Sequence, residues 1–144
     1  MGFEPDSRIE QIAEAYALDA VDLARERFHI ALDWSDASVQ DVESILKRLH
    51  EQISHAKPSA EQVSQFAKTF GSYVGEVFRR NHGARWGMVS LGNDSFPGLQ
   101  AKRTRAEFWP WGKVQKRLVN GPEDNVWHYF QILAAEDGRT EAIR

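Results

Sequence analysis

The 144-residue chain contains no cysteine, only five prolines and no long uninterrupted apolar run. The missing cysteines exclude disulfides, thiolate nucleophiles and every zinc or iron–sulfur site that is built on thiolates. No apolar segment approaches the roughly 18–20 residues that a membrane-spanning helix needs. The N-terminus also lacks the basic start and apolar stretch of a secretory signal. We therefore expect a cytoplasmic protein that is not inserted in a membrane.

Sequence motifs of familiar enzyme classes are missing too. The chain has no Gly-x-Ser-x-Gly nucleophile elbow, no P-loop and no Gly-x-Gly-x-x-Gly phosphate-binding turn. His50 and His55 are five residues apart, which separates them by about 140° around a helix, so they do not form a zinc-protease motif. We expect no metal site, no cofactor and no catalytic residue. The sequence favours a protein without enzymatic activity and leaves an enzyme open as the alternative.

The composition and the hydrophobic pattern predict one α+β domain spanning 1–144. Apolar residues make up 42% of the chain and aromatic residues 11%, enough for a core of its own. We expect an N-terminal group of three helices, a small antiparallel sheet of about three strands and two C-terminal helices, with frayed ends at 1–6 and 137–144. The expected helices are 7–28, 36–54, a third from Ser59 to Gly83, 111–119 and 122–135, and the expected strands are 84–91, 97–103 and 105–109.

Two glycines interrupt the third predicted helix at Gly71 and Gly75. Each costs up to about 1 kcal/mol relative to alanine inside a helix. We expect this cost to be offset by another element that approaches the helix closely on the face without side chains.

Charge is distributed unevenly along the chain, although its net charge is only −3. Residues 1–61 carry 13 carboxylates and 6 basic residues, whereas residues 62–144 carry 8 carboxylates and 12 basic residues. The acidic helices could simply neutralise the basic half by packing beside it. The alternative is that the basic half forms a surface that binds anions.

The segment 102–130 combines aromatic and basic residues more densely than any other part of the sequence. It holds three of the five tryptophans and six of the 18 lysines and arginines. Such a segment can close one side of the core, with lysine and arginine stems lying over the rings. It can also form a binding surface, and single-stranded nucleic acid is one possible ligand. The isoelectric point near 5.9 makes nucleic acid the weaker choice.

A polar cleft is a further possibility for the same region. Glu76 precedes Arg80 by one helical turn, and Asn125 and His128 are three residues apart on the last predicted helix. These side chains could face Lys116 and Arg117 across one cleft. The candidate binding residues are Glu76, Arg80, Trp86, Trp109, Trp111, Lys113, Lys116, Arg117, Asn125 and His128.

Four segments of the chain resemble a family of uncharacterised bacterial proteins. They are YALDAVDLARERF (16–28), LDWSDASVQDVESIL (32–46), FGSYVGEVFRRNHGARW (70–86) and FWPWGKVQKRLVNGPEDNVWHYF (108–130). In order and spacing they are similar to the domain-of-unknown-function group numbered 3806 over about residues 10–133. The resemblance implies a bacterial origin and a shared fold. It brings no catalytic residue, because that family has no established activity.

Taken together, these patterns favour a non-enzymatic intracellular binding module, such as an adaptor or an immunity-type protein, whose partner is another protein. The partner would dock at the Trp109–Arg117 face or at the acidic helices. The alternative is a small-molecule or anion-binding protein or enzyme with a cleft of Glu76, Arg80, Lys116, Arg117 and His128. Single-stranded nucleic-acid binding is the third possibility, and the oligomeric state stays open.

Overall fold

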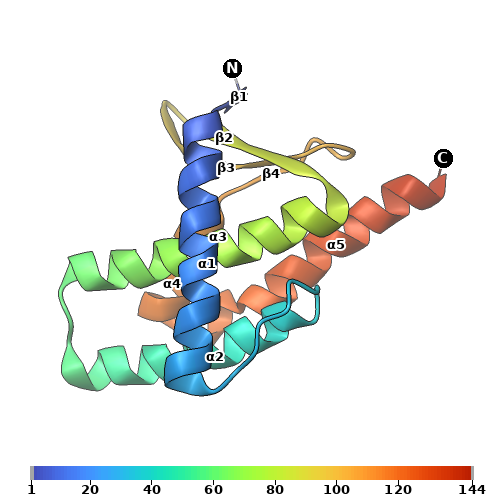
Figure 1. The fold of residues 1–144 in the computed structure, drawn as a ribbon. Helices are drawn as coiled ribbons and strands as arrows, with labels where there is room; N and C mark the ends of the chain where they lie inside the picture. Colours follow the sequence, from blue (N-terminus) through green and yellow to red (C-terminus); the bar gives the residue numbers. More distant parts are fainter. Residues whose placement is uncertain (1, 144) are drawn as a thin grey trace.

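The computed structural model describes residues 2–143, and the side chains of residues 2–138 (Figure 1). Within this range, five α-helices and a four-stranded antiparallel sheet form the predicted α+β fold, with one strand more than the three or so expected. None of the helices in this range is long and apolar enough to cross a membrane. The elements are β1 Phe3–Pro5, α1 Ser7–Phe28, α2 Ser38–Ala56, α3 Ala60–His82, β2 Ala84–Leu91, β3 Asp94–Ala101, β4 Glu107–Phe108, α4 Pro110–Asn120, the 3₁₀ helix η1 Pro122–Asp124 and α5 Val126–Ile143.

Local capping signals fix the starts of the N-terminal helices. Ser59 and Gln62 form a capping box at the start of α3, where the third helix was expected to begin. Asp6 caps α1, where its side chain accepts a hydrogen bond from the backbone N–H of Arg8 at 2.9 Å. The predicted start of α2 at residue 36 is occupied by a turn, in which the Ser35 hydroxyl accepts a bond from the Ser38 N–H.

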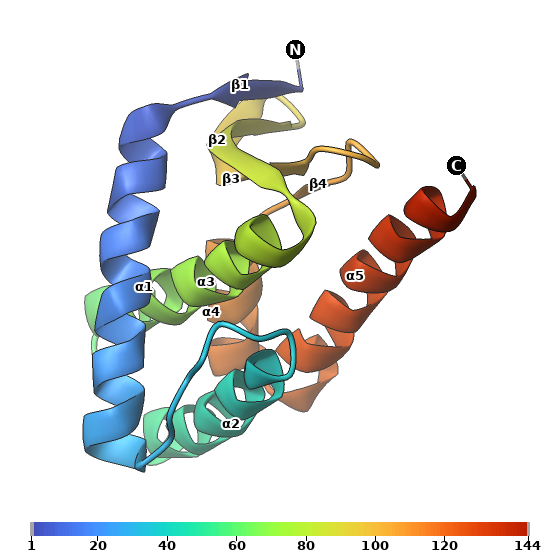
Figure 2. The ribbon, with the colours of Figure 1, turned by 45° about the vertical axis from the view of Figure 1, so that its right-hand side comes forward.

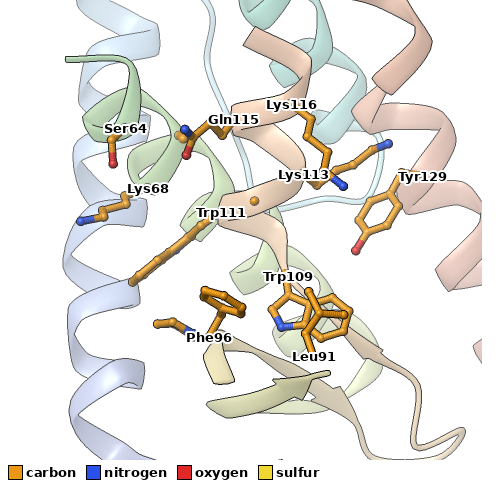
Figure 3. A pocket seen from close by; sticks show the side chains of 13 residues that line it. Ser64, Lys68, Leu91, Phe96, Trp109, Trp111, Lys113, Gln115, Lys116 and Tyr129 are labelled. Carbon is orange, nitrogen blue, oxygen red and sulfur yellow. The ribbon is translucent and has the colours of Figure 1, made fainter. Parts of the chain in front are cut away.

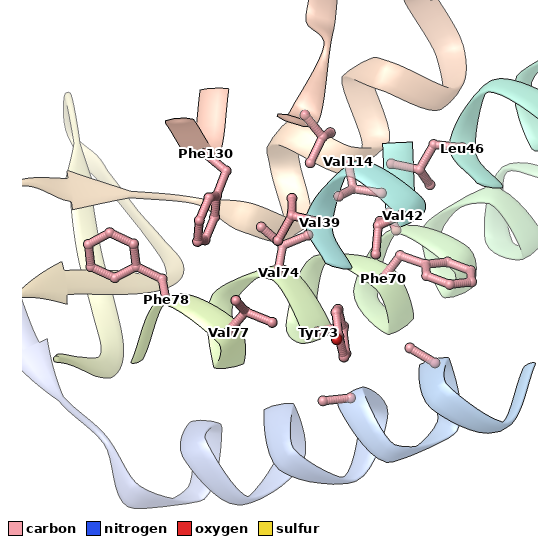
Figure 4. Close-up of a cluster of buried hydrophobic side chains, with 14 of the residues drawn as sticks. Val39, Val42, Leu46, Phe70, Tyr73, Val74, Val77, Phe78, Val114 and Phe130 are labelled. Atoms are coloured by element: carbon pink, nitrogen blue, oxygen red, sulfur yellow. The ribbon is translucent and has the colours of Figure 1, made fainter. Parts of the chain in front are cut away.

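Helix α3 is the centre of the core. Every residue from Thr69 to Phe78 is buried, because other elements surround this part of the helix. Side chains of α2, α4 and α5 pack against it on one side, and α1 lies on the other (Figure 4). The α1 face that meets α3 is made mainly of fully buried alanines, including Ala17, whereas Ile12 on another face of α1 is 47% exposed.

The sheet lies at one end of the helices, beside the start of α1 and the end of α3 (Figure 2). Its strand order is β1-β2-β3-β4, and each neighbouring pair is antiparallel. Strand β1 was not expected, since residues 1–6 were predicted to fray. Phe3 pairs with Val89, and Pro5 pairs with Gly87, where any Cβ would collide with the Glu4 carbonyl.

The C-terminal helices differ from the prediction at the point where they join. Pro122 does not begin the last helix; it begins η1, and α5 starts at Val126. Asn125 caps α5, because its Oδ1 accepts a hydrogen bond from the His128 backbone N–H at 2.8 Å. Helix α5 then extends to Ile143, beyond the predicted end near residue 135.

Candidate functional site

A hollow of about 510 Å³ lies between the β2–β3 hairpin, α3, the start of α4 and α5 (Figure 3). We call it the aromatic groove. Its volume falls within the range of about 300–1,000 Å³ that is typical of ligand sites. Its apolar surface comes mainly from large side chains, namely Leu91, Phe96, Pro97, Trp109, Trp111 and Tyr129. Three lysines also line it, Lys68, Lys113 and Lys116.

Both tryptophans of the Trp109-Pro110-Trp111 turn are held in place by polar and aromatic contacts. The Trp111 Nε1–H donates to the Ser72 hydroxyl at 2.7 Å, and Tyr16 of α1 meets the Trp111 ring edge-on at 6.3 Å between centroids. The Trp109 Nε1–H donates to the Val89 carbonyl at 3.4 Å. Both rings remain partly exposed and line the groove. They therefore present rigid aromatic surface that needs little ordering when a ligand binds.

Each of the two glycines of α3 allows another element to approach the helix closely. A Cβ on Gly71 would lie 2.8 Å from the Pro110 carbonyl oxygen and from the Trp111 Cα. A Cβ on Gly75 would lie 2.5 Å from the buried Trp86 ring. The predicted close approach is confirmed at both positions: at Gly71 the start of α4 lies directly on α3, and at Gly75 the ring of Trp86 from β2 does.

Gly71→Ala is expected to lower the free energy of unfolding by about 2 kcal/mol, because backbone atoms of α4 must move to accept the methyl group. The control is Gly138→Ala on α5, where a Cβ would meet nothing within 4 Å. That change should stabilise the protein by about 0.5–1 kcal/mol. Urea unfolding of both variants measures the difference. Equal stability of the two variants would contradict the contact between α3 and α4.

Charge around the groove is positive. The Lys113 Nζ lies 3.3 Å from Asp124 and 5.2 Å from the centroid of the Tyr129 ring. The Lys68 Nζ lies 5.9 Å from the centroid of the Trp111 ring. Burial raises the pKa of the Tyr129 hydroxyl, so this side chain stays neutral and adds no negative charge.

Four of the predicted residues therefore meet at one site, namely Trp109, Trp111, Lys113 and Lys116. The sequence did not single out Leu91, Phe96, Lys68 or Tyr129, which complete the groove. Alternation along 84–91 placed Leu91 on one face of a strand, but nothing in the sequence indicates which face of the hairpin meets α4.

Glu76, Arg80 and Trp86 lie elsewhere, in a buried network. Glu76 is fully buried and accepts bonds from the Arg79 Nε at 2.6 Å and the Trp86 Nε1 at 2.9 Å. The Arg80 Nε lies 3.4 Å from the same carboxylate, and its guanidinium lies 3.7 Å from the centroid of the Trp34 ring. Burial alone would raise the pKa of Glu76, but the bonds from Arg79 and Trp86 and the two arginine charges lower it below its ordinary value.

Arg117, Asn125 and His128 do not line the groove either. Arg117 is 1% exposed, and its Nη2 lies 2.8 Å from Glu43 of α2. Asn125 is the cap of α5, and the His128 side chain is exposed. The polar cleft predicted from Glu76, Arg80, Lys116, Arg117 and His128 is thus not brought together, because Glu76 and Arg117 are engaged by different ion pairs.

Comparisons of the chain with protein-family models, with curated proteins and with solved structures find no match. The resemblance to the bacterial group described above therefore stays a prediction.

Proposed function

We propose that this chain is a non-enzymatic binding protein that docks a partner protein at the aromatic groove. The observation that supports this most directly is the pair of fixed, partly exposed tryptophans in an apolar hollow. Tryptophan is among the residues that contribute most to protein interfaces, especially where the ring is held before binding. Adaptor and immunity-type proteins both depend on such a face.

The apolar surface continues beyond the hollow, which favours a polypeptide over a small molecule as the occupant. Leu91 is 55% exposed and Phe96 is 46% exposed, although both border the groove. A ligand confined to the hollow would leave part of these side chains in water. A peptide segment that crosses the hairpin covers them as well.

The side chains that most often act as general bases do not line the described part of the groove. Its lining among the described residues includes no carboxylate and no histidine. A general base must lie within hydrogen-bond reach of the proton that it removes. Glu76, the most deeply buried carboxylate near α4, is already engaged by arginines. This arrangement supports binding over chemistry at the site.

Selection from a random peptide library on the immobilised protein tests the proposal. We expect selected peptides to carry large apolar residues, and to bind Leu91→Ser/Phe96→Ser at least about tenfold more weakly than wild type, a loss of about 1.4 kcal/mol. The matched control is Ile12→Ser/Leu18→Ser, because these α1 side chains are 47% and 57% exposed. Selection of no peptide, or equal losses in both variants, would contradict docking at the groove.

A further inference from the structure

The lysines of the aromatic groove are more numerous than the carboxylates that could neutralise them. Asp124 pairs with Lys113, and its pKa is lowered by the Asn120 side chain and by the neighbouring lysines. Lys68 and Lys116 form no ion pair within the part of the chain that the structure describes. Two cationic groups therefore border an apolar surface without being held in a close ion pair, although Lys116 also acts on Asp124 from a greater distance.

These two lysines lie at different ends of the aromatic groove. Figure 3 shows Lys68 beside Trp111 and Lys116 on the side of Tyr129, with Trp111 between the two lysines. Lys68 comes from α3 and Lys116 from α4. A ligand that lies along the groove therefore passes one cation, then apolar surface, then a second cation. The complementary pattern is an apolar centre with negative charge on both sides.

We propose that the segment docked in the aromatic groove is a short acidic peptide of the partner protein, in which apolar side chains contact Trp109 and Trp111 and flanking carboxylates meet Lys68 and Lys116. This inference rests on the proposed docking function and adds the chemistry of the partner. Charge then governs the association rate and the choice of partner, while the apolar contacts supply most of the affinity.

An acidic peptide fits the aromatic groove better than other anionic ligands do. Among the described residues, the cations that line it are all lysines, and no arginine offers the planar, bidentate contact that suits phosphate groups. The whole chain is acidic, with a net charge of −3, which opposes the general attraction that nucleic-acid binding uses. A free fatty or aromatic acid carries one charged end, and so it satisfies one lysine and leaves the other unpaired.

The test uses the tightest peptide from the library selection and two synthetic counterparts, one with every Asp and Glu replaced by the corresponding amide and one with them replaced by lysine. We expect enrichment of Asp and Glu in the selected pool. Fluorescence anisotropy should show about tenfold weaker binding for the amide peptide and no measurable binding for the lysine peptide.

Charge reversal on the protein completes the experiment. The variant Lys68→Glu/Lys116→Glu should bind the acidic peptide more than about tenfold more weakly than wild type does. The same variant should bind the lysine peptide, which wild type does not. Lys47→Glu/Lys102→Glu is the matched control, since it changes the net charge equally at exposed positions outside the aromatic groove. It should leave the affinity within about twofold of wild type.

The two proposals fail in different ways. One outcome is that the amide and acidic peptides bind wild type equally and both bind Leu91→Ser/Phe96→Ser more weakly. Docking at the groove is then supported, and the preference for acidic peptides is overturned. If no peptide depends on the groove, the docking function itself is contradicted. Tighter binding of a single-stranded oligonucleotide or of decanoate than of any selected peptide, with the same dependence on Lys68 and Lys116, would overturn the peptide as the occupant.

Discussion

Glu76→Gln is expected to lower the free energy of unfolding by about 3 kcal/mol at neutral pH. The carboxylate is completely buried, and it satisfies the buried indole N–H of Trp86 as well as the Arg79 guanidinium. Removing its charge leaves Arg80 without its counter-charge and leaves Arg79 with only the more distant Glu14, at 3.7 Å. Breaking a buried ion pair in this way costs about 3–5 kcal/mol. Arg79 and Arg80 are 26% and 37% exposed. Water therefore compensates part of the loss, and we expect the lower end of that range.

The same variant should change how stability depends on pH. The pKa of Glu76 in the folded protein lies below its ordinary value, so this carboxylate binds its proton more readily in the unfolded chain. The stability that ionised Glu76 contributes is fully present above its pKa in the unfolded chain, near 4.5. This contribution is lost as the pH falls through the lower pKa of Glu76 in the folded protein. The difference in stability between wild type and Glu76→Gln should therefore narrow as the pH is lowered from 5 through the acid range.

Urea unfolding at neutral and acid pH measures both effects, and Glu61→Gln on the exposed start of α3 is the control. The control should stay within about 0.5 kcal/mol of wild type. Trp86→Phe should cost about 1–2 kcal/mol through the lost hydrogen bond. Trp86→Phe should cost less when it is combined with Glu76→Gln than when it is made alone, because both changes affect the hydrogen bond between Trp86 and Glu76. A loss below about 1 kcal/mol for Glu76→Gln would contradict the network.

Local signals in the sequence predicted the helices well. The capping box at Ser59 and the periodic apolar residues of α1 to α3 each act within one or two turns, so they can be recognised without knowing the fold. The glycines of α3 predicted a close approach for the same reason. They could not indicate which element approaches, because that depends on the chain path between α3 and α4.

Features that depend on distant contacts escaped prediction. Strand β1 has only three residues and pairs with β2 more than 80 positions later, so no local pattern marks it. The aromatic groove also depends on contacts between distant segments, because its walls come from the β2–β3 hairpin, α3, α4 and α5. Sequence reasoning identified the wall formed by Trp109, Trp111 and the lysines of α4. It missed Leu91 and Phe96, which become neighbours of that wall only in the fold.

Arg117 is predicted as a binding residue but is buried, and the sequence does contain a signal for this burial. It follows Val114 by three residues and precedes Leu118 by one, which places it on the buried face of α4. Lys113 and Lys116 lie on the neighbouring face, toward the groove. Adjacent basic residues on one short helix therefore differ in their surroundings: Lys116 lines the groove, whereas Arg117 pairs with Glu43 inside the fold.

Arg117→Met is accordingly expected to destabilise the protein by about 3–5 kcal/mol, whereas Lys116→Met should stay within about 0.5 kcal/mol. Methionine fills much of the space of the arginine stem, but it leaves Glu43 as a nearly buried carboxylate without a cation. Glu43 also accepts the Val126 backbone N–H at 2.9 Å, at the start of α5. Loss of the ion pair should therefore loosen the contact between α2 and α5 as well.

The double variant Glu43→Gln/Arg117→Met separates the cost of the unpaired charge from the loss of packing. Glutamine can still accept the Val126 N–H, and the change removes the charge that Arg117→Met leaves unpaired. The Arg117 Nη1 has no hydrogen-bond partner and is buried, so removing the guanidinium also removes one unsatisfied donor. We expect the double variant to recover at least about 1 kcal/mol relative to Arg117→Met. If urea unfolding shows that the double variant is no more stable than Arg117→Met, then Arg117 stabilises the protein by packing rather than by its charge. In that case the ion pair with Glu43 contributes little to holding α2, α4 and α5 together.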